Sequence, residues 1–252
     1  MIVGHRGVPT LHQENTVAGF RRAVELGLEA IELDVRLTRD QRAVVFHDAS
    51  TLRLTGVRRA IAELSWDEIS KLRVQPMLSV RGRAVRYERA EPIALLAEVL
   101  AEVGGAVAIN IELKPRFFGD RVAEVVAADI AAAGAGARVM VSSFDPRKLR
   151  EAGRADPALA LGFCWNHSVF GGGRRLVDRL AAGGEVRAVG ADLPLLHEAS
   201  VRRMRAAGLA VGAHVAFPLG AAPTPRAEVE RLLALGLDWI ESDDPARLQQ
   251  IV

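Results

Sequence analysis

The sequence predicts a (β/α)₈ barrel, and three observations favour that fold class. Short runs rich in β-branched and apolar residues alternate with longer amphipathic segments along the whole chain. Eight such runs fit within 252 residues, which is a usual length for a single barrel. A doubly wound open sheet is the alternative, but it needs a glycine-rich phosphate turn after the first strand, which His5-Arg6-Gly7 does not provide. We therefore expect residues 1–252 to form one α/β domain.

The expected strands are short and largely apolar, as the buried strands of a parallel barrel are. Amphipathic segments separate them, and the first begins at Asn15 and Thr16, residue types that cap helices. The strands are expected at residues 2–4, 30–35, 107–113, 139–142, 159–163, 188–191, 210–215 and 239–242. The later helices are expected at residues 93–102, 121–133, 146–153, 174–182, 198–207 and 225–235.

Two segments interrupt this alternation. Residues 43–46 form an additional strand candidate close behind the second strand, which predicts a hairpin rising from the mouth of the barrel. Residues 50–90 then form an insertion with nine Arg or Lys residues against four Asp or Glu residues. Ser65 and Glu68 indicate the start of a short helix inside it. Because insertions of this size at the catalytic face of a barrel are usually lids, we expect this one to cap the mouth.

Charge and cysteine content exclude several classes of protein. The chain has 33 basic and 31 acidic residues, a balance that does not indicate nucleic-acid binding. Its single cysteine, Cys164, cannot form an intramolecular disulfide, which fits a reducing compartment. We find neither a secretory signal nor an apolar run of about 18 residues that would span a bilayer. We therefore expect a soluble, cytoplasmic protein without a membrane span.

Carboxylates gather at the predicted C-terminal ends of strands, where barrels build their active sites. Glu32 and Asp34 are two residues apart on one strand and therefore point to the same face. Glu112 and Lys114 repeat this spacing on the next barrel strand. Three converging carboxylates repel one another unless a cation lies among them, and an all-oxygen set suits Mg²⁺ or Ca²⁺ better than Zn²⁺. The alternative is a rim of carboxylates held by salt bridges.

Two histidines lie close to these carboxylates in the predicted fold. His5 follows the first strand, and His47 follows the hairpin strand. Pairing around a turn centred near residues 40–41 puts His47 opposite Asp34. Two imidazoles that flank a metal fit proton transfer on both sides of a phosphorus centre. The alternative for any single histidine is an ordinary hydrogen-bonded side chain.

Two cations accompany the same groups. Arg6 follows His5 directly, and Lys114 follows Glu112 by two residues. Positive charge at a carboxylate–metal site makes chemical sense when the substrate is an anion such as phosphate. Lys114 is equally suited to be an ion-pair partner of Glu112.

Eight short motifs occur in a fixed order along nearly the whole chain. They are His5-Arg6-Gly7, Glu14-Asn15-Thr16, Glu32-Leu33-Asp34-Val35, His47-Asp48, Thr51-Leu52-x-Leu54-Thr55, Ile111-Glu112-Leu113-Lys114, Ser142-Ser143-Phe144 and Asp243-Asp244-Pro245. Each motif is weak alone, but the ordered set is specific. In this order the chain resembles the glycerophosphodiester phosphodiesterases.

The resemblance implies a barrel with a small insertion and a phosphoric diester hydrolase activity. It implies hydrolysis of glycerophosphodiesters to sn-glycerol 3-phosphate and an alcohol through a cyclic phosphate, with either histidine as the base. It implies one divalent ion, Mg²⁺ or Ca²⁺ with Mn²⁺ as a further candidate. By position, the implied roles are metal binding for Glu32, Asp34 and Glu112, acid–base catalysis for His5 and His47, and phosphate binding for Arg6 and Lys114.

The chain departs from the family pattern at residues 214–217. They are His-Val-Ala-Phe, where the family often has Trp-Thr-x-Asn, so the preferred leaving alcohol stays open. A lysophospholipase D-like enzyme is one alternative, favoured by an apolar wall of Phe117, Phe118, Trp165 and Phe217. A non-catalytic barrel that binds phosphate esters is another, which the loss of a histidine or a metal carboxylate would favour, and none is lost.

Overall fold

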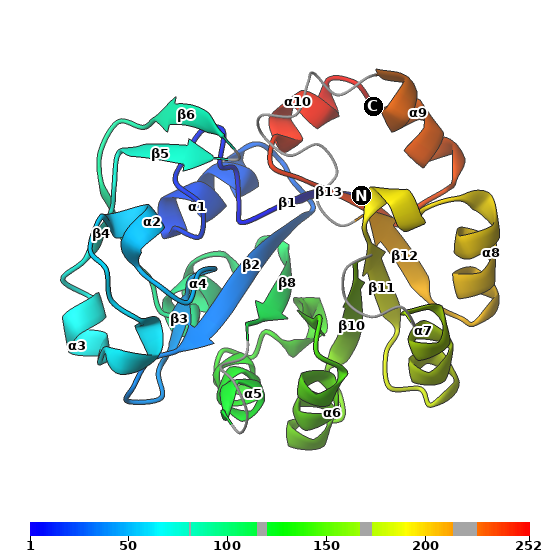
Figure 1. Ribbon diagram of the computed structural model, residues 1–252, viewed down its shortest axis with the longest axis horizontal. Helices are drawn as coiled ribbons and strands as arrows, with labels where there is room; N and C mark the ends of the chain where they lie inside the picture. Colours follow the sequence, from blue (N-terminus) through cyan, green and yellow to red (C-terminus); the bar gives the residue numbers. More distant parts are fainter. Residues whose placement is uncertain (81, 115–119, 167–172, 214–225) are drawn as a thin grey trace.

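The computed structural model describes residues 1–80, 82–114, 120–166, 173–213 and 226–252, and it confirms the predicted barrel (Figure 1). Eight parallel strands follow one another around the barrel, and β1 pairs with both β13 and β2, so the sheet closes. The barrel strands are β1 (Ile2–Gly4), β2 (Ala30–Leu37), β8 (Ala108–Leu113), β9 (Val139–Ser143), β10 (Ala160–Trp165), β11 (Ala188–Ala191), β12 (Ala210–Ala213) and β13 (Trp239–Ser242).

Helices surround the barrel on its outside (Figure 1). The first begins as expected, because the Thr16 hydroxyl accepts a hydrogen bond from the backbone N–H of Gly19 at 3.1 Å. The predicted helix at residues 93–102 begins three residues late, because the carbonyl of Ala94 accepts a hydrogen bond from Val45 in the hairpin. The helices are α1 (Val17–Glu25), α4 (Leu96–Val103), α5 (Val122–Ala132), α6 (Pro146–Ala155), α7 (Gly173–Ala182), α8 (Glu198–Ala206), α9 (Arg226–Ala234) and α10 (Pro245–Gln249), with 3₁₀ turns η2 (Gly136–Arg138) and η3 (Leu193–Leu195).

Alternation along the strands separates the core from the site. On β2, Ile31 and Leu33 are fully buried in the main hydrophobic core, which the barrel and its helices share. Glu32 and Asp34 point to the opposite face of the same strand, toward the barrel interior. The apolar positions of β2 therefore stabilise the barrel, while the positions between them place ionisable side chains inside it.

The hairpin is present, but its register differs from the prediction by one residue. Strand β3 (Ala43–Val45) runs antiparallel to β2 and pairs Val45 with Val35. The loop has three residues, because the Thr38 N–H already bonds to the Arg42 carbonyl at 3.0 Å and Gln41 adopts a left-handed φ of 60°. Phe46, and not His47, therefore lies opposite Asp34, and its N–H donates to the Asp34 carbonyl at 2.8 Å.

The insertion lies beside the hairpin, on one side of the barrel (Figure 1). It has its own hydrophobic cluster, which includes Phe46, Leu54 and Ile69. Ser65 and Glu68 form the predicted start of α3, since each side chain accepts a hydrogen bond from the other's backbone N–H. The elements are α2 (Leu52–Thr55), η1 (Ile61–Glu63), α3 (Trp66–Ile69), β4 (Arg73–Val74), β5 (Met77–Val80), β6 (Arg83–Arg86) and β7 (Glu91–Pro92). That the chain forms one domain stays a prediction.

Candidate active site

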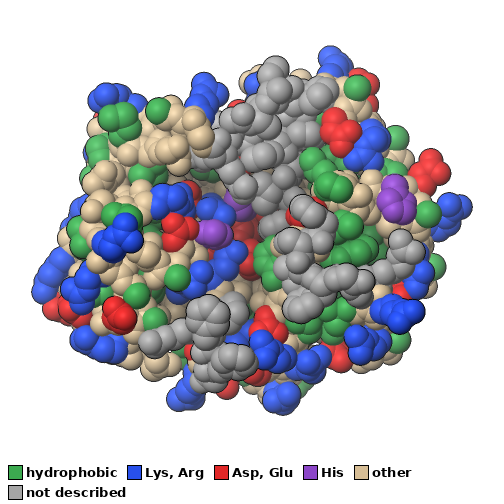
Figure 2. All heavy atoms as spheres, in the orientation of Figure 1, with side chains coloured by type: hydrophobic (Ala, Val, Ile, Leu, Met, Phe, Trp, Pro, Cys, Tyr) green, Lys and Arg blue, Asp and Glu red, His purple; other side chains and the backbone are tan. Residues whose placement is uncertain are grey.

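Ionisable side chains meet at the C-terminal ends of β1, β2, β8 and β13. Figure 2 shows histidine, acidic and basic side chains together near the middle of the face that it views. Although they are ionisable, His5, Glu32, Asp34 and Glu112 are each at most 3% exposed. Burial of so many ionisable groups is costly unless they are paired, so their contacts define what the site can do.

The three predicted metal ligands lie together. Asp34 and Glu112 are register partners on neighbouring strands, and Glu32 precedes Asp34 by two residues. One oxygen from each of the three carboxylates lies within 4.8 Å of the others. Within the part of the chain that the structure describes, Glu32 Oε1 has no hydrogen-bond partner, although Glu32 is 1% exposed. A buried set of oxygen donors with an unsatisfied oxygen fits a hard divalent cation.

The carboxylates differ in their electrostatic surroundings. Burial, and then repulsion by Asp34 and Glu241, raise the pKa of Glu32 well above its usual range. Burial also acts to raise the pKa of Asp34, but Lys114 and Arg6 together hold it well below its usual range. The negative charge of Glu32 is therefore less compensated by neighbouring cations than that of Asp34.

Lys114 forms ion pairs with two of the predicted metal ligands. Its Nζ lies 2.5 Å from Glu112 Oε1 and 3.1 Å from Asp34 Oδ1. Burial acts to lower the pKa of Lys114, but Asp34 and Glu112 outweigh it, so the pKa is raised and the side chain stays charged. In this arrangement Lys114 is the ion-pair partner that the sequence left open as an alternative.

Arg6 contacts most of the site. With a left-handed φ of 54°, it donates from its backbone N–H to Glu32 Oε2 at 2.9 Å. Its guanidinium donates to Glu14 Oε1 at 2.9 Å and lies 3.2 Å from Asp34 Oδ2. This conformation costs a non-glycine residue about 1–2 kcal/mol, which these charge-assisted contacts offset.

His5 is held by a residue from the other end of the chain. Its Nδ1 lies 2.5 Å from Oδ1 of Asp243, which directly follows β13. Arg6 Nε donates to His5 Nε2 at 3.2 Å, which requires a lone pair on that nitrogen. The network therefore assigns the ring proton to Nδ1 and leaves Nε2 as an acceptor. Asp243 was noted in the sequence only as part of a motif, and its contact with His5 was missed.

His47 is oriented by the hairpin and the insertion. Its Nδ1 lies 2.7 Å from Asp48 Oδ1. Arg53 of α2 donates to Asp48 Oδ2 at 2.7 Å and to both oxygens of Glu14 at 2.7 Å. Glu14 therefore joins Arg6 to Arg53, and Arg53 joins the insertion to His47. Neither link was predicted, although both residues lie within or between quoted motifs.

Most residues of the predicted apolar wall lie outside the described residues. Phe117, Phe118 and Phe217 lie outside the described residues, as does the departure at residues 214–217. Trp165 at the end of β10 is 9% exposed and belongs to the main hydrophobic core.

Comparison with known proteins identifies the family. The model of the glycerophosphoryl diester phosphodiesterase family matches residues 5–247. The chain belongs to this family. The resemblance inferred from the eight motifs is thereby confirmed.

Individual members share part of the sequence and nearly all of the fold. The chain is 33% identical over 167 residues to a glycerophosphodiester phosphodiesterase of Caldanaerobacter subterraneus subsp. tengcongensis, covering 66% of each chain. It is 36% identical over 112 residues to the Homo sapiens lysophospholipase D GDPD1, covering 44% of this chain and 35% of that protein. Both matches span under two thirds of the relative's length. The crystal structure of a Silicibacter pomeroyi protein described as a putative glycerophosphoryl diester phosphodiesterase superposes with a TM-score of 0.86 at 25% identity, covering 99% of this chain and 92% of that one.

Proposed function

We propose that this protein hydrolyses glycerophosphodiesters to sn-glycerol 3-phosphate and an alcohol with the help of one divalent metal ion. The observation that carries the proposal is a histidine, oriented by Asp243 with Nε2 as hydrogen-bond acceptor, beside a buried cluster of three carboxylates. Membership of the glycerophosphoryl diester phosphodiesterase family supports the substrate class.

Glu32, Asp34 and Glu112 would hold the metal, which is Mg²⁺ or Ca²⁺, with Mn²⁺ as a further candidate. The fit rests on the all-oxygen donor set and on the buried Glu32 Oε1 without a partner among the described residues. When bound, the ion supplies Lewis-acid polarisation of the phosphodiester.

His5 and His47 transfer the protons. His5 Nε2, which already accepts a hydrogen bond, takes the proton of a glycerol hydroxyl as the oxygen attacks phosphorus. Asp243 stabilises the imidazolium that results. His47, oriented by Asp48, donates a proton to the departing alcohol. Water then opens the cyclic phosphate while the two histidines exchange roles.

Arg6 and Lys114 bind the phosphate. Both now neutralise carboxylates of the same cluster, Arg6 at Asp34 and Lys114 at Asp34 and Glu112. With these carboxylates holding a divalent ion, Arg6 and Lys114 would be needed less for their neutralisation and could donate to the phosphate oxygens. Arg6→Ala should therefore raise KM together with any fall in kcat.

A lysophospholipase D activity is the second candidate, favoured by the similarity to the human enzyme of that name. Hydrolysis of glycerophosphocholine and of lysophosphatidylcholine, measured side by side, separates the two. Faster turnover of the lysolipid would favour the second candidate.

Metal removal tests the proposal. Protein treated with a chelator should lose glycerophosphocholine hydrolysis and regain it with Mg²⁺, Ca²⁺ or Mn²⁺. Glu112→Gln should abolish the rescue, whereas Glu124→Gln, at an exposed carboxylate on α5, should not. Full activity in the chelated sample would contradict metal dependence. Absence of hydrolysis with every metal and diester would favour a non-catalytic phosphate-ester-binding barrel.

A further inference from the structure

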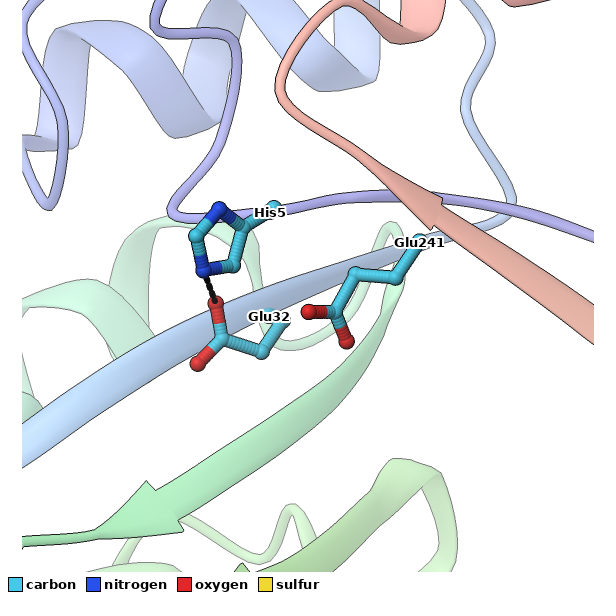
Figure 3. Close-up of side chains that lie close together, drawn as sticks. All are labelled: His5, Glu32 and Glu241. Atoms are coloured by element: carbon cyan, nitrogen blue, oxygen red, sulfur yellow. Dashed lines mark ion pairs between the residues drawn. The ribbon is translucent and has the colours of Figure 1, made fainter. Parts of the chain in front are cut away.

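A further glutamate lies beside the catalytic groups and has no role in the proposed function. Glu241 is on β13 and is 1% exposed. Figure 3 shows its carboxylate approaching Glu32 from the side, with the His5 ring above. One ligand atom from each of His5, Glu32 and Glu241 lies within 4.8 Å of the others.

The His5 ring is oriented as metal-binding histidines are. Such histidines usually donate one ring N–H to a carboxylate, which fixes the lone pair of the other nitrogen. Here Asp243 holds Nδ1 at 2.5 Å, and Nε2 lies 3.9 Å from Glu32 Oε2. Arg6 Nε now donates to Nε2 at 3.2 Å, but Asp34 Oδ2 lies equally close to that donor. Arg6 can therefore release the ring and keep its contact with Asp34.

The charges also favour a cation at this position. Glu32 and Glu241 are two buried carboxylates, and Glu32 Oε1 has no hydrogen-bond partner in the described part of the chain. Glu241 contributes to the raised pKa of Glu32 although Arg6 opposes it, and a cation between Glu32 and Glu241 would offset this repulsion.

We propose that His5, Glu32 and Glu241 form a second cation site, which takes a first-row transition-metal dication such as Zn²⁺. Its donors are one imidazole nitrogen and two carboxylates, a set that suits Zn²⁺, whereas the all-oxygen set of Glu32, Asp34 and Glu112 suits Mg²⁺ or Ca²⁺. The two sites share Glu32.

Zn²⁺ at the second site inhibits the enzyme. The bound ion occupies the Nε2 lone pair, which His5 needs in order to accept a proton. This consequence rests on the proposed function, whereas the binding of Zn²⁺ does not.

Counting the bound ions in four proteins tests the second site. Without Mg²⁺, equilibrium dialysis against Zn²⁺ should give two ions for the unchanged protein, one for Glu241→Gln, one for Glu112→Gln and none for Glu32→Gln. With saturating Mg²⁺, the unchanged protein should keep one Zn²⁺. Under these conditions Glu241→Gln should lower the Zn²⁺ affinity by at least about 100-fold. Loss of a residue that only hydrogen-bonds to a metal ligand costs up to about 100-fold, so a larger loss identifies Glu241 as a direct ligand.

A spectroscopic measurement on the unchanged protein covers the case in which a variant does not fold. The ring ¹⁵N signal of His5 Nε2 should shift when Zn²⁺ is added to the Mg²⁺-loaded protein, by far more than Mg²⁺ alone shifts it. Two results together would overturn the second site. The His5 signal would not move when Zn²⁺ is added, and the protein would bind a single Zn²⁺ that Glu241→Gln keeps and Glu112→Gln loses. That result would leave the proposed function standing, whereas full activity in chelated protein would instead overturn metal dependence.

Discussion

The two halves of the active site are built in different ways. His5 is 3% exposed, and its partner Asp243 is 238 residues away in the chain, after the neighbouring barrel strand β13. The His47 side chain is 32% exposed, and its partner Asp48 is the next residue in the chain. Barrel closure thus fixes the first histidine, while the second depends on Arg53 and the insertion with its separate small core. Changes in the insertion should therefore affect the His47 half selectively.

Removal of either histidine should have the largest effect and should distinguish the halves. His5→Ala and His47→Ala should each lower kcat by about 10²–10⁴-fold, the range for one positioned acid or base. A nitrophenyl ester, whose leaving group needs no proton, should rescue His47→Ala far more than His5→Ala. The opposite rescue pattern would exchange the proposed roles. Near-normal turnover of a natural diester by both variants would make the histidines structural.

Arg53→Lys should weaken the His47 half without removing a catalytic group. Lysine keeps the charge but loses the planar fork that spans Asp48 and Glu14. We expect kcat on a natural diester to fall by about tenfold, a smaller loss than removal of the acid itself, with little change on the nitrophenyl ester. Arg58→Lys, at an exposed arginine of the same insertion, is the matched control. Equal losses on both substrates would show that Arg53 acts on the whole site.

Glu14 links the two halves, because it binds both Arg6 and Arg53, and its contribution should appear in the pH dependence of the free energy of unfolding. Burial acts to raise the pKa of Glu14, but the hydrogen bond from Arg53 and the charge of Arg6 outweigh it, so the pKa is lowered. A carboxylate with a lowered folded-state pKa contributes stability above its unfolded pKa and loses it as pH falls through the folded value. Glu14→Gln should lower the free energy of unfolding at pH 7 by about 1–3 kcal/mol. Urea unfolding should show this difference shrinking below about pH 4; a constant difference would contradict the charge argument.

The smallest effect expected is a change in hydrogen exchange. If the insertion caps the mouth and holds the glycerol end of the substrate, glycerol phosphate should slow amide exchange in residues 50–90, while α8 on the other side of the barrel serves as reference. Unchanged exchange throughout the insertion would make it a surface decoration.

The sequence predicted most of the barrel because each strand is short, apolar and bounded by polar residues. Side-chain alternation was sufficient to bring Glu32 and Asp34 to one face, and strand order was sufficient to add Glu112. The hairpin register was wrong by one residue, since nothing local indicated that Gln41 would take a left-handed conformation in a three-residue loop. The Asp243, Glu14 and Arg53 contacts were missed because they depend on how distant segments meet, which no local pattern encodes.

The contact between His5 and Asp243 ties chemical competence to completion of the fold. A ribosome releases residue 5 long before residue 243, so His5 of an emerging chain lacks the carboxylate that orients its ring. Only when β13 pairs with β1 does that partner arrive. The last barrel strand in chain order therefore completes the surroundings of the histidine that follows the first strand, and a barrel without β13 lacks the group that orients His5.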